Sequence, residues 1–106
     1  MDARAFQQRA DECLQRVTRW LEDFDPDELD YTSSDGVVTL SFADGQRFVL
    51  NRQSAASQMW LAAGARAWHY RFDESRGEWL DDKDAHALLE RLGSTVSEKL
   101  GRAVKP

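Results

Sequence analysis

Hydrophobic residues recur every three or four positions near both ends of the chain, a spacing typical of helices that bury one face. Near the start the repeat comprises Phe6, Ala10, Cys13, Leu14, Val17, Leu21 and Phe24. Near the end it comprises Ala85, Leu88, Leu89, Leu92, Val96 and Leu100. We predict a first helix that Asp2 caps and Pro26 ends, because proline disfavours helical conformation in the residue before it. We predict a second helix that begins near Asp82 or Asp84.

Between these helices the hydrophobic period changes to two, which is typical of β-strands. In VVTLSF, Val38, Leu40 and Phe42 point to one face, and Phe48 and Leu50 repeat the alternation in RFVLN. Further strands are expected at QMWLAA, AWHYRF and EWLD. Asp-Gly pairs at 35–36 and 44–45 fit hairpin turns, because glycine readily adopts positive φ.

This order of elements predicts one domain over residues 1–106 with an α+β fold. Strands joined by short turns pair antiparallel, and helices at the two ends of such a chain pack on one face of the sheet. We therefore predict a two-layer sandwich: two terminal helices packed on one face of an antiparallel sheet of about six strands.

The second face of this sheet is left uncovered, so its residues are candidates for binding. If Met59 and Leu61 point inward, alternation turns Gln58 and Trp60 outward, beside Asn51 of the neighbouring strand. Trp60 is then expected to be exposed. Tryptophan is enriched at binding hot spots, but it also packs flat against neighbouring strand residues, and the pattern leaves both interpretations open.

Acidic residues are concentrated in one part of the chain. Residues 20–46 contain no Lys or Arg and eight acids: Glu22, Asp23, Asp25, Asp27, Glu28, Asp30, Asp35 and Asp44. The formal net charge is −5. This charge favours cations or a basic protein as partner, and it opposes binding to nucleic acid or an anionic membrane. The chain shows no apolar run of membrane-spanning length and no secretory signal at its start, so we expect a cytoplasmic protein.

The residue types favour a weak metal site and not an enzyme. Carboxylates are hard oxygen ligands suited to iron, manganese, magnesium or calcium. Neither His69 nor His86 has a second His or Cys at helical spacing, so we do not expect either to bind metal. Cys13 lies on the apolar stripe of the first helix and is expected in the core. No catalytic triad, phosphate loop or dinucleotide fingerprint is present, so no enzyme activity is expected.

Two motifs resemble the frataxin family, and above all its bacterial members. They are NRQ at residues 51–53 and QMWLA at 58–62, preceded by DGVVTLSFADGQRFVL and by an acidic end of the first helix. The resemblance extends from ADE at 10–12 to LLE at 88–90. It implies weak binding of iron, as Fe²⁺ or Fe³⁺, with other divalent cations also accepted. It also implies regulation of iron–sulfur cluster assembly by a monomer that docks on the cysteine desulfurase, with the cluster scaffold protein as a second candidate partner.

The resemblance assigns the metal to an acidic ridge. The ridge comprises Asp11, Glu22, Asp23, Asp25, Asp27 and Asp30, with Glu28 as a neighbour. Where bacterial relatives tend to have two more acids, this chain has Thr18 and Arg19. Because Arg19 and Arg16 lie one turn from acidic residues, we expect partial neutralisation of the helix and a metal site displaced toward residues 22–30.

The resemblance also assigns partner binding to the open sheet face, through Asn51, Gln53, Gln58 and Trp60. A different class of function remains open on the residues alone, namely a metal-independent acidic protein-interaction domain. Partner binding by such a domain would not respond to iron or to a chelator, whereas binding by an iron-linked regulator would.

Overall fold

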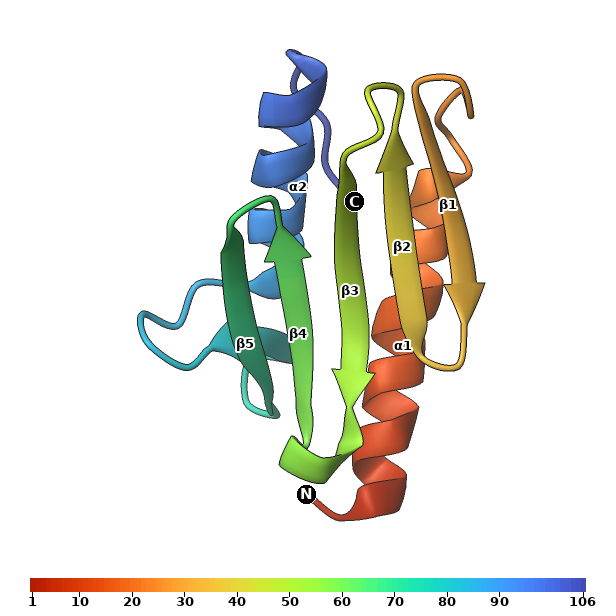
Figure 1. The fold of residues 1–106 in the computed structure, drawn as a ribbon. Coiled ribbons are helices and arrows are strands. Elements are labelled where there is room, and N and C mark those ends of the chain that lie inside the picture. Colours follow the sequence, from red (N-terminus) through yellow and green to blue (C-terminus); the bar gives the residue numbers. More distant parts are fainter.

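The computed structural model describes residues 1–106 as two helices packed on one face of a six-stranded antiparallel sheet, with strand order β1-β2-β3-β4-β5-β6 (Figure 1). The helices are α1 (Ala3–Leu21) and α2 (Leu88–Leu100), with a short 3-10 helix η1 (Ser54–Ala56) between β3 and β4. The strands are β1 (Leu29–Ser34), β2 (Val37–Phe42), β3 (Arg47–Gln53), β4 (Gln58–Ala63), β5 (Arg66–Asp73) and β6 (Glu78–Asp81). The predicted α+β two-layer sandwich is confirmed. Neither helix combines the length and the apolar sequence needed to cross a lipid bilayer.

Helix α1 begins as predicted, because the Asp2 carboxylate accepts a hydrogen bond from the backbone N–H of Ala5 at 2.7 Å. Its end differs from the prediction: the helix stops at Leu21, a turn before Pro26. After Glu22, the backbone N–H groups of Asp23 and Phe24 bond three residues back instead of four, which tightens the chain into a turn. Acidic side chains also face the negative end of the helix dipole here, which disfavours further helical turns. Pro26 therefore lies in the following loop and does not end the helix.

Buried apolar residues alternate with outward-facing residues along the central strands, as predicted. The inward residues of its central strands are fully buried, among them Val38, Leu40, Leu50, Met59 and Leu61. Asp35 and Gly36 join β1 to β2 with φ of 52° and 76°, the two consecutive positive values that a tight two-residue hairpin requires. The helices cover only this inward face, so the opposite face of the sheet is open (Figure 1).

Helix α2 begins at Leu88 and not near Asp82 or Asp84. The Asp81 carboxylate accepts hydrogen bonds from the backbone N–H groups of Lys83 and Asp84, at 2.8 and 3.1 Å. These bonds favour a turn over a helix, because a short acidic side chain competes for the backbone donors. Residues 82–87 therefore form a loop at the end of β6.

Candidate functional site

The acidic ridge lies where α1 passes into β1, the strand at one edge of the sheet (Figure 1). Glu22 follows the helix, Asp23 to Glu28 form the connecting loop, and Asp30 lies in β1. Five members are exposed: Glu22, Asp23, Asp25, Asp27 and Asp30. Asp11 and Glu28 are partly buried. The fold thus gathers Glu22 to Asp30 at one end of the molecule. Asp11 lies about 16 Å back along α1 from Glu22, beside Arg52 at the end of β3, and does not join them.

Two members of the ridge are held by basic residues. Asp11 accepts a hydrogen bond from Arg52 at 2.9 Å, across from β3, and Glu28 pairs with Arg102 at 2.5 Å. The five exposed members have no basic group within 4.0 Å. Uncompensated charge is therefore concentrated at residues 22–30, the part of the ridge to which the sequence analysis assigned the metal.

The ridge carboxylates do not converge on one point. Asp25 accepts a hydrogen bond from the backbone N–H of Asp27 at 2.9 Å, which turns the loop around Pro26 and spreads the side chains. No three ridge carboxylates have oxygens within 4.8 Å of one another. An ion bound here would therefore keep several waters, and its affinity would be low.

The negative potential of the ridge affects the pKa of Tyr31. Its hydroxyl donates a hydrogen bond to Glu22 at 3.0 Å. This bond, partial burial, and the charges of Glu22 and Asp30 raise the pKa of the Tyr31 hydroxyl above its ordinary value. The same potential attracts cations to the ridge.

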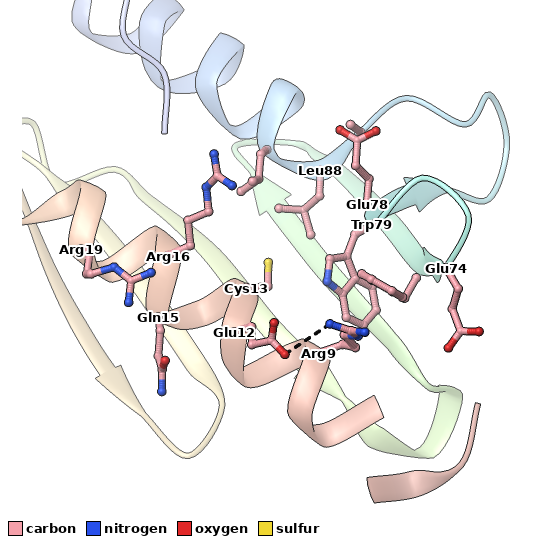
Figure 2. A pocket seen from close by; sticks show the side chains of 14 residues that line it. Arg9, Glu12, Cys13, Gln15, Arg16, Arg19, Glu74, Glu78, Trp79 and Leu88 are labelled. Carbon is pink, nitrogen blue, oxygen red and sulfur yellow. Dashed lines mark hydrogen bonds and ion pairs between the residues drawn. The ribbon is translucent and has the colours of Figure 1, made fainter. Parts of the chain in front are cut away.

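The expected pairing of Arg16 with Glu12 and of Arg19 with Asp23 does not occur. Glu12 pairs with Arg9 at 3.5 Å, and Arg16 and Arg19 make no ion pair. Both line a groove of about 550 Å³ between α1, β6 and the start of α2, shown in Figure 2. Cys13 forms part of its floor, and burial raises the pKa of the Cys13 thiol to about 12, with a smaller opposite effect of Arg16. The thiol is thus protonated at neutral pH and is a core residue, as predicted.

The four predicted partner-binding residues form two cross-strand pairs on the open face of the sheet. Asn51 lies opposite Trp60, and Gln53 lies opposite Gln58. The prediction that Trp60 is exposed is wrong, because its ring is partly buried, and Gln58 is only 4% exposed. The indole N–H of Trp60 donates a hydrogen bond to the Gln58 side-chain oxygen at 2.8 Å, which fixes the orientation of the ring.

Two further residues support this face, and neither is predicted from the sequence. His69 lies opposite Trp60 in β5 and stacks on its ring, with centroids 4.3 Å apart and an angle of 17° between the planes. Asp82 accepts a hydrogen bond from the Gln58 amide at 2.7 Å. Alternation along AWHYRF places His69 outward, so the sequence held a signal for it. Asp82 could not be found this way, because it lies in a loop of irregular structure.

One group of potential metal ligands does converge. Ligand atoms of Asp81, Asp84 and His86 lie within 4.8 Å of one another, at the end of β6 and in the loop before α2. The sequence predicts no metal ligand at His86, because no second His or Cys stands at helical spacing from it. The loop, and not a helix, brings the three side chains together.

The fold is that of a small two-layer α+β protein whose candidate functional residues lie on an acidic edge and an open sheet face. A family model described as a frataxin-like domain matches residues 1–102, and the chain belongs to this family. The resemblance found in the sequence is thereby confirmed.

Curated relatives and solved structures agree with this assignment. Proteins named "Iron-sulfur cluster assembly protein CyaY" from Thioalkalivibrio sulfidiphilus and Dechloromonas aromatica are each 35% identical, over 102 and 105 residues. These matches cover 95% of both chains for the first, and 98% of this chain and 97% of the relative for the second. Frataxin from Psychromonas ingrahamii has a TM-score of 0.88 at 27% identity, covering 99% of this chain and 97% of that one. A trimeric Saccharomyces cerevisiae frataxin complexed with ferrous iron has a TM-score of 0.75 at 27% identity, covering 89% and 87%.

Proposed function

We propose that this protein is a non-enzymatic, iron-binding regulator of iron–sulfur cluster assembly that acts as a monomer and docks on the cysteine desulfurase. The observation that carries the proposal is the group of five exposed ridge carboxylates without a basic partner. The names of the curated relatives and the ferrous complex of the yeast relative support the same function. The cluster scaffold protein is a second candidate partner.

Iron binding by the ridge follows from charge and exposure. Carboxylate oxygens suit Fe²⁺ and Fe³⁺, and each ion removes part of the repulsion among neighbouring acids. Because the carboxylates are spread along a loop and a strand, one ion contacts few of them and keeps much of its hydration. The ridge therefore binds weakly and discriminates poorly between cations, as a regulator that releases its metal requires.

An anaerobic Fe²⁺ titration followed by amide NMR tests the ridge. Amide signals of residues 22–30 should shift or broaden, whereas potassium at equal ionic strength should leave them unchanged. The double variant Asp25→Asn/Asp27→Asn should lose most of this response and keep its fold, because both side chains are exposed. Signals of residues 22–30 that ignore Fe²⁺ in the parent protein would contradict the assignment.

Docking is proposed to use the ridge and the open face together. Asp30 in β1 and Trp60 in β4 are three strands and about four residues apart, which corresponds to about 20 Å. One protein interface of ordinary size covers both. Charges act over distance and mainly set the association rate, whereas a desolvated aromatic ring mainly sets the lifetime of the complex.

Surface plasmon resonance against the desulfurase at two salt concentrations separates these contributions. Asp25→Lys/Asp27→Lys should slow association and reduce its dependence on salt. A control, Glu74→Lys/Glu90→Lys, makes the same charge change at exposed acids outside the ridge and should associate faster than the ridge variant. If the two Lys variants associate equally fast, only net charge matters and the ridge does not dock.

The same experiment tests the open face. Trp60→Ala should raise the dissociation rate about thirtyfold if the ring is a hot spot worth about 2 kcal/mol. Because Trp60 is partly buried, its variant must first show the parent's melting temperature within a few degrees. A folded Trp60→Ala protein that dissociates at the parent rate would remove the ring from the interface.

The alternative function, a metal-independent acidic interaction domain, is distinguished by adding Fe²⁺ or a chelator during the binding measurement. The proposed regulator changes its affinity for the desulfurase when iron occupies the ridge, because bound iron cancels charge that attracts the partner. Identical binding curves with iron and with chelator would favour the alternative.

A further inference from the structure

The loop between β6 and α2 contains a second cluster of metal-binding side chains, on the opposite edge of the sheet from the ridge. Asp81 ends β6, and Asp84 and His86 follow in the loop. β6 is five strands from β1, a separation of about 24 Å, so this cluster and the ridge share no residue and no ion. We propose that Asp81, Asp84 and His86 form a site for a divalent transition-metal ion such as Zn²⁺, Co²⁺ or Fe²⁺.

The imidazole of His86 is oriented as a ligand. Its Nε2 atom lies 2.8 Å from the hydroxyl of Tyr70, a fully buried residue of β5. Its Nδ1 atom therefore faces the carboxylates and lies 2.5 Å from Asp84. Metal-binding histidines are commonly fixed in this way, by a hydrogen bond at the ring nitrogen remote from the ion.

Tyr70 can serve as this fixed partner because it is fully buried and its hydroxyl can either donate or accept a hydrogen bond. Without an ion, the Nδ1–H of His86 donates to the Asp84 carboxylate and Nε2 accepts from the Tyr70 hydroxyl. An ion that binds Nδ1 displaces this proton, and the Tyr70 hydroxyl can then rotate to accept a hydrogen bond from Nε2–H.

The backbone holds the loop closed before any ion arrives. The backbone N–H of Asp81 donates to the carbonyl of His86 at 2.9 Å, and that of Ala85 donates to the carbonyl of Asp81 at 3.1 Å. Ala85 has a φ of 60°, which turns the chain so that Asp84 and His86 face each other. Asp81 is 8% exposed and anchored by two backbone donors, so one carboxylate of the site is already desolvated and in place.

The spacing fits a small transition-metal ion after a modest adjustment. Ligand atoms at about 2.1 Å from a tetrahedral ion are about 3.4 Å from one another. The contact between Asp84 and His86 would open by somewhat less than 1 Å, and the widest spacing, up to 4.8 Å, would close by about 1.4 Å. Asp84 is exposed and can move, whereas Asp81 and His86 are anchored.

The donor set decides which ions bind. An imidazole nitrogen beside two carboxylates favours Zn²⁺, Co²⁺ and Fe²⁺ over Mg²⁺ and Ca²⁺, which prefer oxygen ligands alone. The ridge offers oxygen ligands only, so the two sites respond differently to an excess of Mg²⁺. Three protein ligands also leave at least one position of the ion open to water.

Isothermal titration of the full chain with Zn²⁺ in excess Mg²⁺ tests the site. The parent protein should bind one Zn²⁺, and His86→Gln should weaken this binding about tenfold or more. His69→Gln changes the other histidine and is the matched control, so it should bind as the parent does. The ridge variant Asp25→Asn/Asp27→Asn should also bind Zn²⁺ normally, which separates this site from the proposed iron function.

A second variant controls for the case in which His86→Gln weakens Zn²⁺ binding only by loosening the loop. The Asp84 side chain is 65% exposed, so Asp84→Asn should keep the fold, which amide NMR verifies, and still weaken Zn²⁺ binding about tenfold. Parent-like Zn²⁺ affinity in both His86→Gln and folded Asp84→Asn would overturn the proposal. Loss of Zn²⁺ binding in the ridge variant, with the loop variants unaffected, would equally overturn it by assigning the ion to the ridge.

Discussion

The ion pair between Arg52 and Asp11 joins the sheet to α1, and its strength can be measured with a double-mutant cycle. The charged atoms are 2.9 Å apart, and the side chains are 21% and 45% exposed. At this distance the Coulomb energy is about 1.4 kcal/mol in water and about 6 kcal/mol at an effective dielectric constant of 20. Desolvation and solvent screening offset most of this energy, so we expect a coupling energy of about 1 kcal/mol.

The assay is urea unfolding of the parent protein, Asp11→Asn, Arg52→Gln and the double variant. A cycle on Arg66 and Glu98 is the matched control, because that pair is longer, at 3.4 Å, and more exposed, at 52% and 69%. We expect a coupling energy below about 0.3 kcal/mol for the control pair. A coupling energy for Arg52 and Asp11 no larger than that of the control would refute the argument.

The same variants connect stability to metal binding. In the parent protein Arg52 donates a hydrogen bond to the Asp11 carboxylate, so this carboxylate contributes little to metal binding by the ridge. In Arg52→Gln the carboxylate is released, and Fe²⁺ should then perturb amides around residue 11 as well as those of residues 22–30. No such extension of the perturbed region would show that Asp11 does not belong to the metal-binding ridge.

Two further predictions concern turns of the sheet. Gly36→Ala places a methyl group 2.7 Å from the Arg52 guanidinium carbon at a φ of 76°, whereas Gly45→Ala, at a φ of 89°, meets nothing within 4 Å. In urea unfolding, backbone strain should lower the free energy of unfolding of both variants by about 1–2 kcal/mol. Gly36→Ala should lower it further, because its methyl group meets Arg52. Equal losses in the two variants would contradict the close approach of Arg52. Hydrogen bonds from Lys99 and from the backbone N–H of Gln46 lower the pKa of Asp44 in the folded protein. The charged carboxylate therefore stabilises the fold above the unfolded pKa of about 3.9. This contribution to stability is lost as the pH falls through the lower folded pKa. Asp44→Asn should therefore reduce the fall in melting temperature below about pH 4, and parallel curves for parent and variant would refute this.

The fold was predictable because its main signals are local. The period of the hydrophobic residues changes from three or four to two and back, and Asp-Gly pairs mark the hairpins. Short connections then allow only antiparallel neighbours. The larger error, at the start of α2, occurs where a side chain competes for backbone donors: Asp81 holds residues 82–87 in a loop, and this displaces the start of α2 to Leu88.

The candidate sites were less predictable because they depend on contacts between distant residues. The acidic ridge could be identified from composition, but nothing local indicated that Arg52 holds Asp11, 41 positions away. Likewise, no second His or Cys stands at helical spacing from His86, and only the loop brings it to Asp81 and Asp84. Exposure of Trp60 was overestimated because alternation gives the face of a strand and not what covers it there.

The segment NRQ connects the two surfaces to which we assign function, because successive residues of a strand point to opposite faces. Asn51 and Gln53 lie on the open face opposite Trp60 and Gln58, whereas Arg52 reaches the other way to Asp11 on α1. The backbone N–H of Arg52 also donates to the carbonyl of Gly36 at 2.8 Å, which ties the end of β3 to the first hairpin. A substitution at Arg52 keeps this backbone bond. It therefore acts on the ridge through charge, and on the docking face only through the loss of the side-chain contact that ties β3 to α1. Only the effect on the ridge depends on charge. Arg52→Lys should therefore preserve the charge balance of the ridge, whereas Arg52→Gln should alter both this balance and the position of β3. Comparing the association and dissociation rates of the two variants with the desulfurase separates the electrostatic effect from the structural one.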